Sequence, residues 1–265
     1  MNERTIPIAL TIAGSDSGGG AGVQADLKTF HAFGVYGTSA VTAVTAQNTI
    51  GVRSVHALPP DEVRAQILAV VDDLRPAAVK TGMLATQALV VEVARTIGEA
   101  QLDRFVMDPV MVATSGDRLL QPDAVQALRG LLLPLASLVT PNLEEAAILS
   151  GHPVRSLDQM RDAARVIADL GAAAVLVKGG HLEGDAVDLL WDGVEEHIWR
   201  RPRIVTRHTH GTGCTLSAAI TAGLARGRDL TTAVDAAVRF VARAIEAAPG
   251  LGSGRGPINH FVAHD

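Results

Sequence analysis

One stretch of the sequence places a lone thiol next to three small residues. Cys214 is the single cysteine of the chain, and it follows Gly211, Thr212 and Gly213 at the start of an expected helix. Backbone N–H groups at a helix start bind anions, so we expect residues 211–213 to form an anion hole. A thiol at such a position is expected to have a lowered pKa and to act as a base or nucleophile. The alternative is an inert cysteine that caps the helix.

A glycine-rich turn follows the first apolar run. Residues 14–22 read GSDSGGGAG, which permits close approach of the backbone to a ligand. Gly20 and Ala21 stand where a P-loop has Lys and Ser or Thr, and Val23 stands where a dinucleotide fingerprint has its third glycine. The turn is therefore neither of these two motifs.

Oxygen donors follow two expected strands. Asp108 comes directly after one, and Asn142 and Glu145 lie three residues apart at the start of a helix. Asn and Glu at this spacing are also typical of a capping box, which is the structural alternative. Taken together, the three side chains offer oxygen ligands for a hydrated Mg²⁺ ion.

Lysine is scarce in this chain, which makes its positions informative. Lys28, Lys80 and Lys178 are the only lysines among 23 Lys and Arg residues, so a compact ammonium group is expected to matter most at Lys178. Lys178 precedes two glycines, which suits a phosphate contact, with a surface lysine as the alternative. Gln47 ends a strand and offers a donor and an acceptor to a heterocycle.

Two histidines, His208 and His210, have a spacing that could suggest a metal site. No third ligand type lies nearby in the sequence, so we interpret His210 as structural and His208 as part of a loop surface.

These residues require elements that bring them together. Short apolar runs alternate with longer amphipathic stretches, which predicts a three-layer α/β/α sandwich around a mostly parallel sheet. Expected strands are residues 6–12, 38–45, 77–81, 105–108, 138–140, 174–178, 186–191 and 196–199. Expected helices are residues 21–33, 60–74, 87–100, 122–132, 143–149, 157–170, 214–225 and 230–247. Ligands of such sheets bind beyond the carboxyl ends of the strands, where all the residues above lie.

Composition limits the class of protein. The chain of 265 residues is 48% hydrophobic, 19% charged and 3% aromatic, which excludes a disordered chain and predicts an aliphatic core. No linker divides residues 1–265, so we expect one domain. A net charge of −5 without a basic block argues against nucleic acid or a membrane as partner. The apolar start is too short for a signal sequence, so we expect a cytoplasmic protein.

The motifs occur in an order that resembles the ribokinase-like superfamily, and within it the hydroxymethylpyrimidine/phosphomethylpyrimidine kinases of thiamin biosynthesis. The matching segments are residues 13–28, 45–49, 80–83, 108–111, 114–117, 140–143, 178–181 and 210–215, with a weaker match at 256–257. Cysteine in the Gly-Thr-Gly-Cys turn separates this group from the sugar kinases, which have aspartate there. One departure is Arg207-His208, where relatives often have Lys-Asn before this turn.

The resemblance implies that ATP phosphorylates 4-amino-5-hydroxymethyl-2-methylpyrimidine (HMP) and then its monophosphate. It assigns the pyrimidine to Gln47, with Gly14, Asp16, Val44 and Met83 lining the same pocket. It assigns the transferring phosphate to residues 211–213 and the general base to Cys214. It assigns Mg²⁺ and the triphosphate to Asp108, Asn142 and Glu145, and a phosphate contact to Lys178.

Other functions remain open at this point. Pyridoxal and pyridoxine are also flat heterocycles with a hydroxymethyl group, so a vitamin B6 kinase is the main alternative. A pyrimidine-binding sensor without catalysis is a second, although Cys214, Asp108 and the glycines of the anion hole are all present. The resemblance favours a homodimer and leaves a monovalent cation requirement open.

Overall fold

The computed structural model of the chain describes residues 6–111, 120, 121, 123–180, 182 and 184–264. Within these residues, one sheet of nine strands has the order β3-β2-β1-β4-β5-β6-β7-β8-β9. The strands are β1 (Ile8–Ser15), β2 (Tyr36–Gln47), β3 (Val52–Ala57), β4 (Ala78–Thr81), β5 (Phe105–Met107), β6 (Leu138–Val139), β7 (Val175–Gly179), β8 (Ala186–Trp191) and β9 (Glu196–Arg201).

The centre of the sheet is parallel and its two margins are antiparallel. Strands β2, β1, β4, β5, β6 and β7 pair in parallel, whereas β3, β8 and β9 join as antiparallel strands. The prediction of a mostly parallel sheet is confirmed. The edge strand β3 was not predicted, because its sequence VRSVHA is largely exposed and lacks an apolar face.

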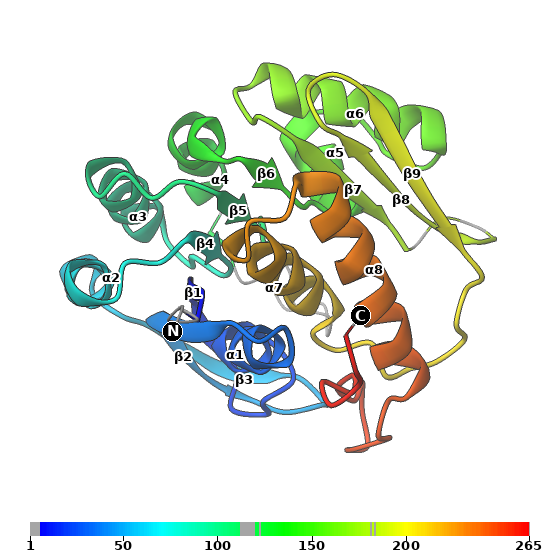
Figure 1. Ribbon diagram of the computed structural model, residues 1–265, viewed down its shortest axis with the longest axis horizontal. Helices are drawn as coiled ribbons and strands as arrows, with labels where there is room; N and C mark the ends of the chain where they lie inside the picture. The colour runs from blue at the N-terminus through cyan, green and yellow to red at the C-terminus, as the bar shows by residue number, and fades with distance from the viewer. Residues whose placement is uncertain (1–5, 112–119, 122, 181, 183, 265) are drawn as a thin grey trace, which may run out of the picture.

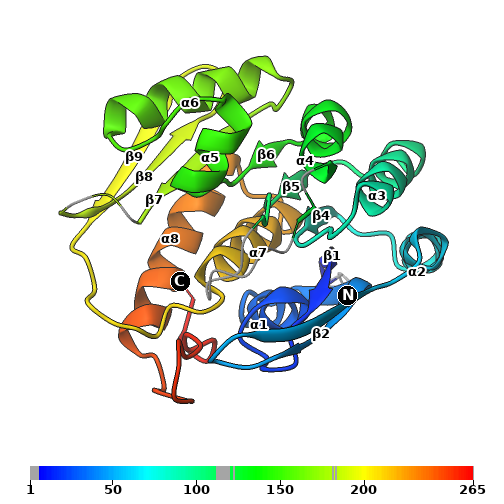
Figure 2. The same ribbon diagram turned by 180° about the vertical axis from the view of Figure 1, so that it is seen from behind.

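Helices cover both faces of the sheet (Figures 1 and 2), so the predicted three-layer sandwich is confirmed. One layer holds α1 (Gly22–Ala32), α7 (Thr212–Ala225) and α8 (Leu230–Glu246). The other holds α2 (Pro60–Asp73), α3 (Gln87–Glu99), α4 (Ala124–Ala127), α5 (Leu143–Ser150) and α6 (Leu157–Asp169). Because each layer packs its apolar side chains on one face of the sheet, the strand ends stay free to hold a site.

The aliphatic core predicted from composition is present, with a few aromatic rings on one side. Phe33 and Phe240 meet edge to face with ring centroids 5.1 Å apart, between α1 and α8. Helix α7 is small-residue rich and almost wholly buried. It can therefore lie close under the sheet, which brings its first turn to the carboxyl ends of the central strands.

The helix expected over residues 122–132 is only partly an ordinary helix in the described residues. After α4, residues Leu128–Leu132 form a π-helical turn and Leu133–Leu135 a 3₁₀ turn. Pro134 lacks the N–H that would bond the carbonyl of Gly130 four residues earlier, so the regular ladder cannot continue there.

Some sequence motifs lie outside the described residues, namely residues 114–117 and His181. None of the described helices is long and apolar enough to cross a lipid bilayer.

Candidate active site

A cavity of about 1660 Å³ opens at the carboxyl ends of the parallel strands. The residues predicted for the site that line it are Gly14, Asp16, Gln47, Met83, Asp108, Asn142, Glu145, Lys178, Gly211, Thr212, Gly213 and Cys214. Val44 is not among the lining residues and is half exposed on β2. The structure therefore brings together every predicted site residue except Val44.

Asp16 organises the glycine-rich turn. Its buried carboxylate accepts hydrogen bonds from the backbone N–H groups of Gly18, Gly20 and Ala21, at 2.8 to 3.0 Å. It also contacts Nε2 of His210 at 2.8 Å. Burial alone would raise the pKa of Asp16, but these bonds and the His210 ring lower it. Both carboxylate oxygens are thus engaged within the protein, which makes Asp16 an organiser of the loop that lines the cavity.

Gln47 presents a side-chain amide to the cavity with only long contacts to the protein. Its Nε2 lies 3.4 Å from Nε2 of His210, and its Oε1 lies 3.5 Å from the hydroxyl of Thr45. The backbone of Gln47 is held firmly by reciprocal bonds with the hydroxyl of Ser17. A fixed backbone with a loosely held amide suits the recognition of a polar heterocycle.

Gly14 and Met83 lie against each other on the wall of the cavity. A Cβ atom at Gly14 would come within 2.5 Å of the Met83 methyl group, so a larger residue at position 14 would require the end of this flexible side chain to move. Met83 supplies a flexible apolar surface there.

The anion hole depends on a left-handed residue at the start of α7. Gly211 has φ +84°, and a Cβ atom there would lie 1.7 Å from the carbonyl oxygen of Gly20. Only glycine fits this conformation and this contact. The helix then begins at Thr212, and the N–H groups of its first turn have no intrahelical acceptor by geometry. The N–H of Thr212 also donates to the carbonyl of Thr209 at 3.3 Å, whereas the N–H groups of Gly213 and Cys214, residues that line the cavity, suit a phosphate.

Cys214 lies in this first turn, but its acidity differs from the expectation. Burial raises the pKa of the thiol, whereas Lys80 and the hydrogen bond from the Gly22 N–H lower it. Burial has the larger effect, and the resulting pKa is about 11. The expected lowered pKa was therefore wrong for the free protein. The helix start is a weaker influence here than the loss of water around the sulfur.

Lys178 and Asp108 form a buried ion pair directly below the anion hole. The ammonium Nζ lies 3.0 Å from Oδ1 of Asp108 and 3.2 Å from where a Cβ of Gly213 would be. Asp108 also accepts hydrogen bonds from the hydroxyls of Thr140 and Ser217. Burial would raise the pKa of Asp108, yet the charge of Lys178 keeps it lowered, so the carboxylate stays ionised.

Glu145 and Asn142 form the capping box that the spacing allowed. The Asn142 side chain accepts from the Glu145 N–H, and Glu145 Oε2 accepts from the Asn142 N–H, both at 2.9 Å. Burial raises the pKa of Glu145 to about 7 despite the nearby charge of Lys178. The capping and the functional interpretations are compatible, because the box fixes a carboxylate at the edge of the cavity.

The donor set at this edge fits a divalent cation of the Mg²⁺ class. Asp108 and Glu145 are two buried carboxylates sharing one ammonium, Lys178. Burial is the main cause of the raised pKa of Glu145, and a cation held by both carboxylates would offset the cost of ionising it there.

Three residues at or near the cavity were not predicted as site residues from the sequence. His210, interpreted as structural, bridges Asp16 and Gln47 and lines the cavity. Lys80 and Asp26 form a completely buried ion pair near the cavity floor. The scarcity of lysine was the one available signal for Lys80.

The departure at residues 207 and 208 also borders the cavity. Arg207 lines both the large cavity and a smaller neighbouring one that includes Gln47 and His210. His208 lies beneath it, with its buried Nδ1 close to where a Cβ of Gly256 would be.

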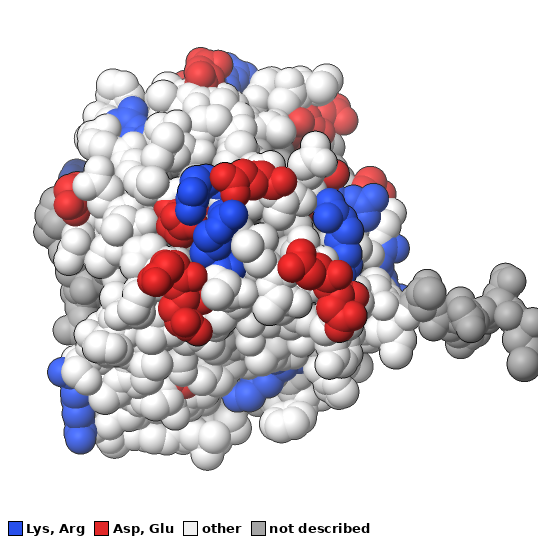
Figure 3. Space-filling model, turned by 90° about the vertical axis from the view of Figure 1, so that its left-hand side faces the viewer, with Lys and Arg blue, Asp and Glu red and all other residues white. Residues whose placement is uncertain are grey.

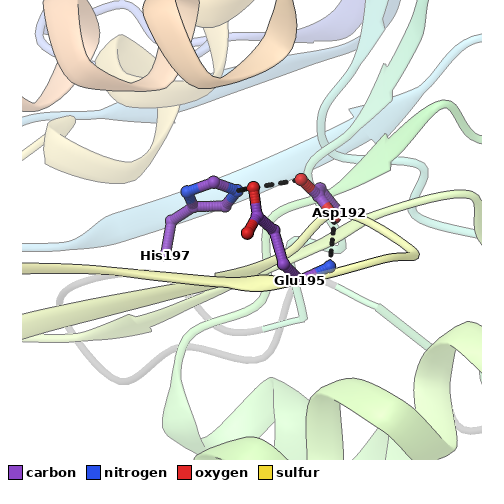
Figure 4. A group of neighbouring side chains, drawn as sticks. All are labelled: Asp192, Glu195 and His197. Atoms are coloured by element: carbon purple, nitrogen blue, oxygen red, sulfur yellow. Dashed lines mark hydrogen bonds and ion pairs between the residues drawn. The ribbon is translucent and has the colours of Figure 1, made fainter.

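A separate cluster, Asp192, Glu195 and His197, lies in the turn between β8 and β9 (Figure 4). Asp192 accepts from the N–H groups of Val194 and Glu195 and contacts the His197 ring at 2.8 Å. These bonds, led by the one from Glu195, lower the pKa of Asp192 to about 2. The cluster is explained by the tight hairpin turn that it closes.

Comparison with known proteins gives consistent results. The family model described as phosphomethylpyrimidine kinase matches residues 16–259. A hydroxymethylpyrimidine/phosphomethylpyrimidine kinase of Bacillus subtilis is 51% identical over 256 residues, covering 96% of this chain and 94% of that protein.

Solved structures are similar in fold and sequence. A Bacillus subtilis pyridoxal kinase in complex with ADP is 44% identical, with a TM-score of 0.90 over 97% of this chain and 98% of that one. A Clostridium difficile phosphomethylpyrimidine kinase is 43% identical, with a TM-score of 0.81 over 90% of this chain and 99% of that one. Because the family model spans most of the chain and the sequence identities are high, this chain belongs to the phosphomethylpyrimidine kinase family of the ribokinase-like superfamily.

Proposed function

We propose that this enzyme transfers the terminal phosphate of ATP to HMP and then to HMP monophosphate, giving the diphosphate used in thiamin biosynthesis. The observation that carries the proposal is one cavity that holds a heterocycle-binding amide, Gln47, and a phosphate-binding helix start, residues 211–213. The ion pair of Lys178 with the buried Asp108, and Glu145 as well, line the same cavity.

Gln47 would hold the pyrimidine by its amide, against the wall formed by Gly14 and Met83. The ring would then present its hydroxymethyl group toward α7. Holding acceptor and donor in this geometry is the main part of catalysis in phosphoryl transfer.

In the first step, the hydroxyl oxygen bonds to the terminal phosphorus of ATP, the bond from phosphorus to the bridging oxygen breaks, and ADP leaves with that electron pair. The proton of the hydroxyl passes to the Cys214 thiolate. N–H groups of residues 211–213 and the ammonium of Lys178 would stabilise the charge on the transferring group. Asp108 and Glu145, with Asn142 beside them, would hold Mg²⁺, which neutralises charge on the triphosphate.

In the second step, the acceptor is a phosphate oxygen. The second pKa of a phosphate monoester is about 6, so this acceptor has largely lost its proton at neutral pH. The second step therefore depends less on a base than the first.

Pyridoxal is the second candidate acceptor, and the similarity in fold and sequence to a pyridoxal kinase favours it as a side activity. A ring nitrogen and a hydroxymethyl group would satisfy the same amide and the same anion hole.

The test is an assay of the purified protein with ATP and Mg²⁺, in which HMP, its monophosphate and pyridoxal are supplied separately. We expect HMP and the monophosphate both to yield the diphosphate. Turnover of pyridoxal without turnover of the monophosphate would replace the proposal with a vitamin B6 kinase. Tight binding of HMP without turnover would replace it with a sensor.

We also propose that the whole chain works as one kinase domain, in the cytoplasm and as a homodimer. Tyr36, Val44 and Val55 are exposed apolar side chains on neighbouring strands β2 and β3, which supports a subunit contact at this margin of the sheet. On the face drawn in Figure 3, acidic and basic side chains of the described residues are interspersed, which supports small-molecule partners.

A further inference from the structure

A completely buried ion pair lies below the cavity, between α1 and β4. The Lys80 ammonium is 2.9 Å from Oδ2 of Asp26, and both side chains have no exposed surface. The Thr11 hydroxyl donates to the same oxygen at 2.6 Å. Among the described residues, Oδ1 of Asp26 has no hydrogen-bond partner.

Stability does not explain this pair. Taking two charges out of water costs more than their attraction returns unless every polar atom is satisfied, and apolar residues of the same volume often serve as well or better. The unpartnered oxygen of Asp26 adds to that cost. The Lys80–Asp26 pair below the cavity therefore indicates a functional role beyond the stability of the fold.

The pair lies next to the thiol of Cys214. Gly22, the first residue of α1, donates its backbone N–H to the sulfur, and Asp26 follows one helical turn later. Lys80 lies at the carboxyl end of β4, which packs against α7, and it lines the same cavity as Cys214. The sulfur therefore lies where α7 meets the start of α1, and β4, which carries Lys80, packs against α7.

Four charged groups act on this thiol. Apart from burial, which raises the pKa of Cys214 most, Lys80 lowers that pKa while Asp26 and Asp108 raise it. Lys178 also interacts with the sulfur, from β7. Lys178 interacts with Asp108 and Glu145, the two residues proposed to hold Mg²⁺. Lys80 is instead held by Asp26, which is not one of these residues.

We propose that the buried Lys80–Asp26 pair positions the charge that lets Cys214 act as a base. This inference rests on the proposed role of Cys214 in the first phosphorylation. Lys80 favours the thiolate, and Asp26 both holds the ammonium in place and limits its effect. Neither residue touches the reacting atoms in this account, so both are positioning residues.

Because Cys214 is the single cysteine, the rate of alkylation by iodoacetamide reports its thiolate directly. The rate is measured against pH for the wild type, Asp26→Asn and Lys80→Met. We expect the midpoint of the curve of alkylation rate against pH to fall by about one pH unit in Asp26→Asn and to rise by about one unit in Lys80→Met. Each shift corresponds to a tenfold change in the thiolate fraction at a given pH.

The opposite signs separate this proposal from a purely structural role. Both substitutions break the same pair, so simple loosening of the fold would lower both midpoints toward the ordinary thiol value. Two shifts in the same direction, or no shift in folded variants, would overturn the proposal. Lys80→Gln keeps a hydrogen-bond donor for Asp26 while removing the charge. We expect its midpoint to rise as well, and this variant replaces Lys80→Met if the latter does not fold.

Lys28→Met is the matched control, because Lys28 is an exposed lysine of α1 that bonds the carbonyl of Gly19. Its midpoint should equal that of the wild type. The titration needs no substrate, so its failure leaves the proposed function standing. Absence of HMP phosphorylation by the wild type would overturn that function and leave the titration valid.

Discussion

Among the single residues of the site, Cys214 depends most on its surroundings, since burial raises the pKa of its thiol to about 11 although Lys80 lowers it. Asp108, Lys178 and Cys214 were each predicted from their place after a strand or before a helix, and all three line the cavity. The acidity of Cys214 was not predictable, because it depends on burial and on Lys80 and Asp26, which come from other parts of the chain. A pKa is set by the whole environment of a group, and a motif shows only its local part.

Replacing Cys214 by alanine should affect the two phosphorylations unequally. The hydroxyl acceptor must lose a proton, whereas the phosphate acceptor has largely lost it, so we expect kcat for HMP to fall about 100-fold or more and kcat for the monophosphate to fall much less. Since the thiol pKa is about 11, the wild-type rate on HMP should also rise between pH 7 and pH 9.

Separate steady-state assays with each acceptor measure this difference. Equal losses in both steps, or a flat pH profile for the wild type with HMP, would show that Cys214 is not the base.

Glu145 should make the metal-free protein less stable as pH rises. Its pKa is raised by burial from 4.5 to about 7, so the native state prefers the protonated form. Stability from this group is full below its unfolded pKa and is lost as pH rises through about 7. Glu145→Gln should therefore have a free energy of unfolding higher than that of the wild type at pH 8.5 without Mg²⁺, by an amount on the order of 1–3 kcal/mol. Its Tm should accordingly be higher at pH 8.5 and equal to that of the wild type near pH 4.

Thermal unfolding at the two pH values, with and without Mg²⁺, measures this effect. Mg²⁺ should stabilise the wild type more than the variant. A variant less stable than the wild type at pH 8.5 without Mg²⁺ would contradict the account.

Among the strands, the pattern of apolar residues predicted the buried strands β1 and β4 and missed the exposed strand β3. The central strands β1 and β4 are almost wholly buried and were found within a few residues of their bounds, although β4 carries the polar residues Lys80 and Thr81. Strand β3 was missed because pairing with β2, and not burial, makes it a strand. The π-helical turn after α4 and the 3₁₀ turn that follows it were not predicted, because the apolar spacing of residues 122–132 is the same for these turns as for a regular helix.

Two glycines at the ends of α7 allow the effect of a positive φ to be separated from the effect of a close contact with the Gly20 carbonyl oxygen. Gly211 and Gly227 both have positive φ, at +84° and +77°, but only a Cβ atom at residue 211 would meet a backbone oxygen. We expect Gly211→Ala to displace the anion hole and lower kcat about 100-fold or more for both acceptors. Gly227→Ala should cost about 1 kcal/mol of stability and leave activity unchanged.

Circular dichroism and steady-state assays of the two variants test this directly. Comparable activity in both would mean that the N–H groups of residues 211–213 do not bind the transferring phosphate.

At the scale of the whole molecule, the order of strands explains why residues far apart in sequence meet. Parallel strands β1, β4, β5, β6 and β7 end at one edge, so Gly14, Asp108 and Lys178 reach the same cavity. Val44 was assigned to the pocket by resemblance alone, and it lies on β2 outside the lining. Sequence order could not show this, because it does not fix which side of a strand faces the ligand.

In the proposed function, one cavity performs two successive phosphoryl transfers. The most direct measurement is a time course with HMP, ATP and Mg²⁺, in which the monophosphate, the diphosphate and ADP are quantified together. We expect the monophosphate to appear first, the diphosphate to follow, and two ADP to form for each diphosphate. A reaction that stops at the monophosphate with one ADP for each product would contradict the proposed function.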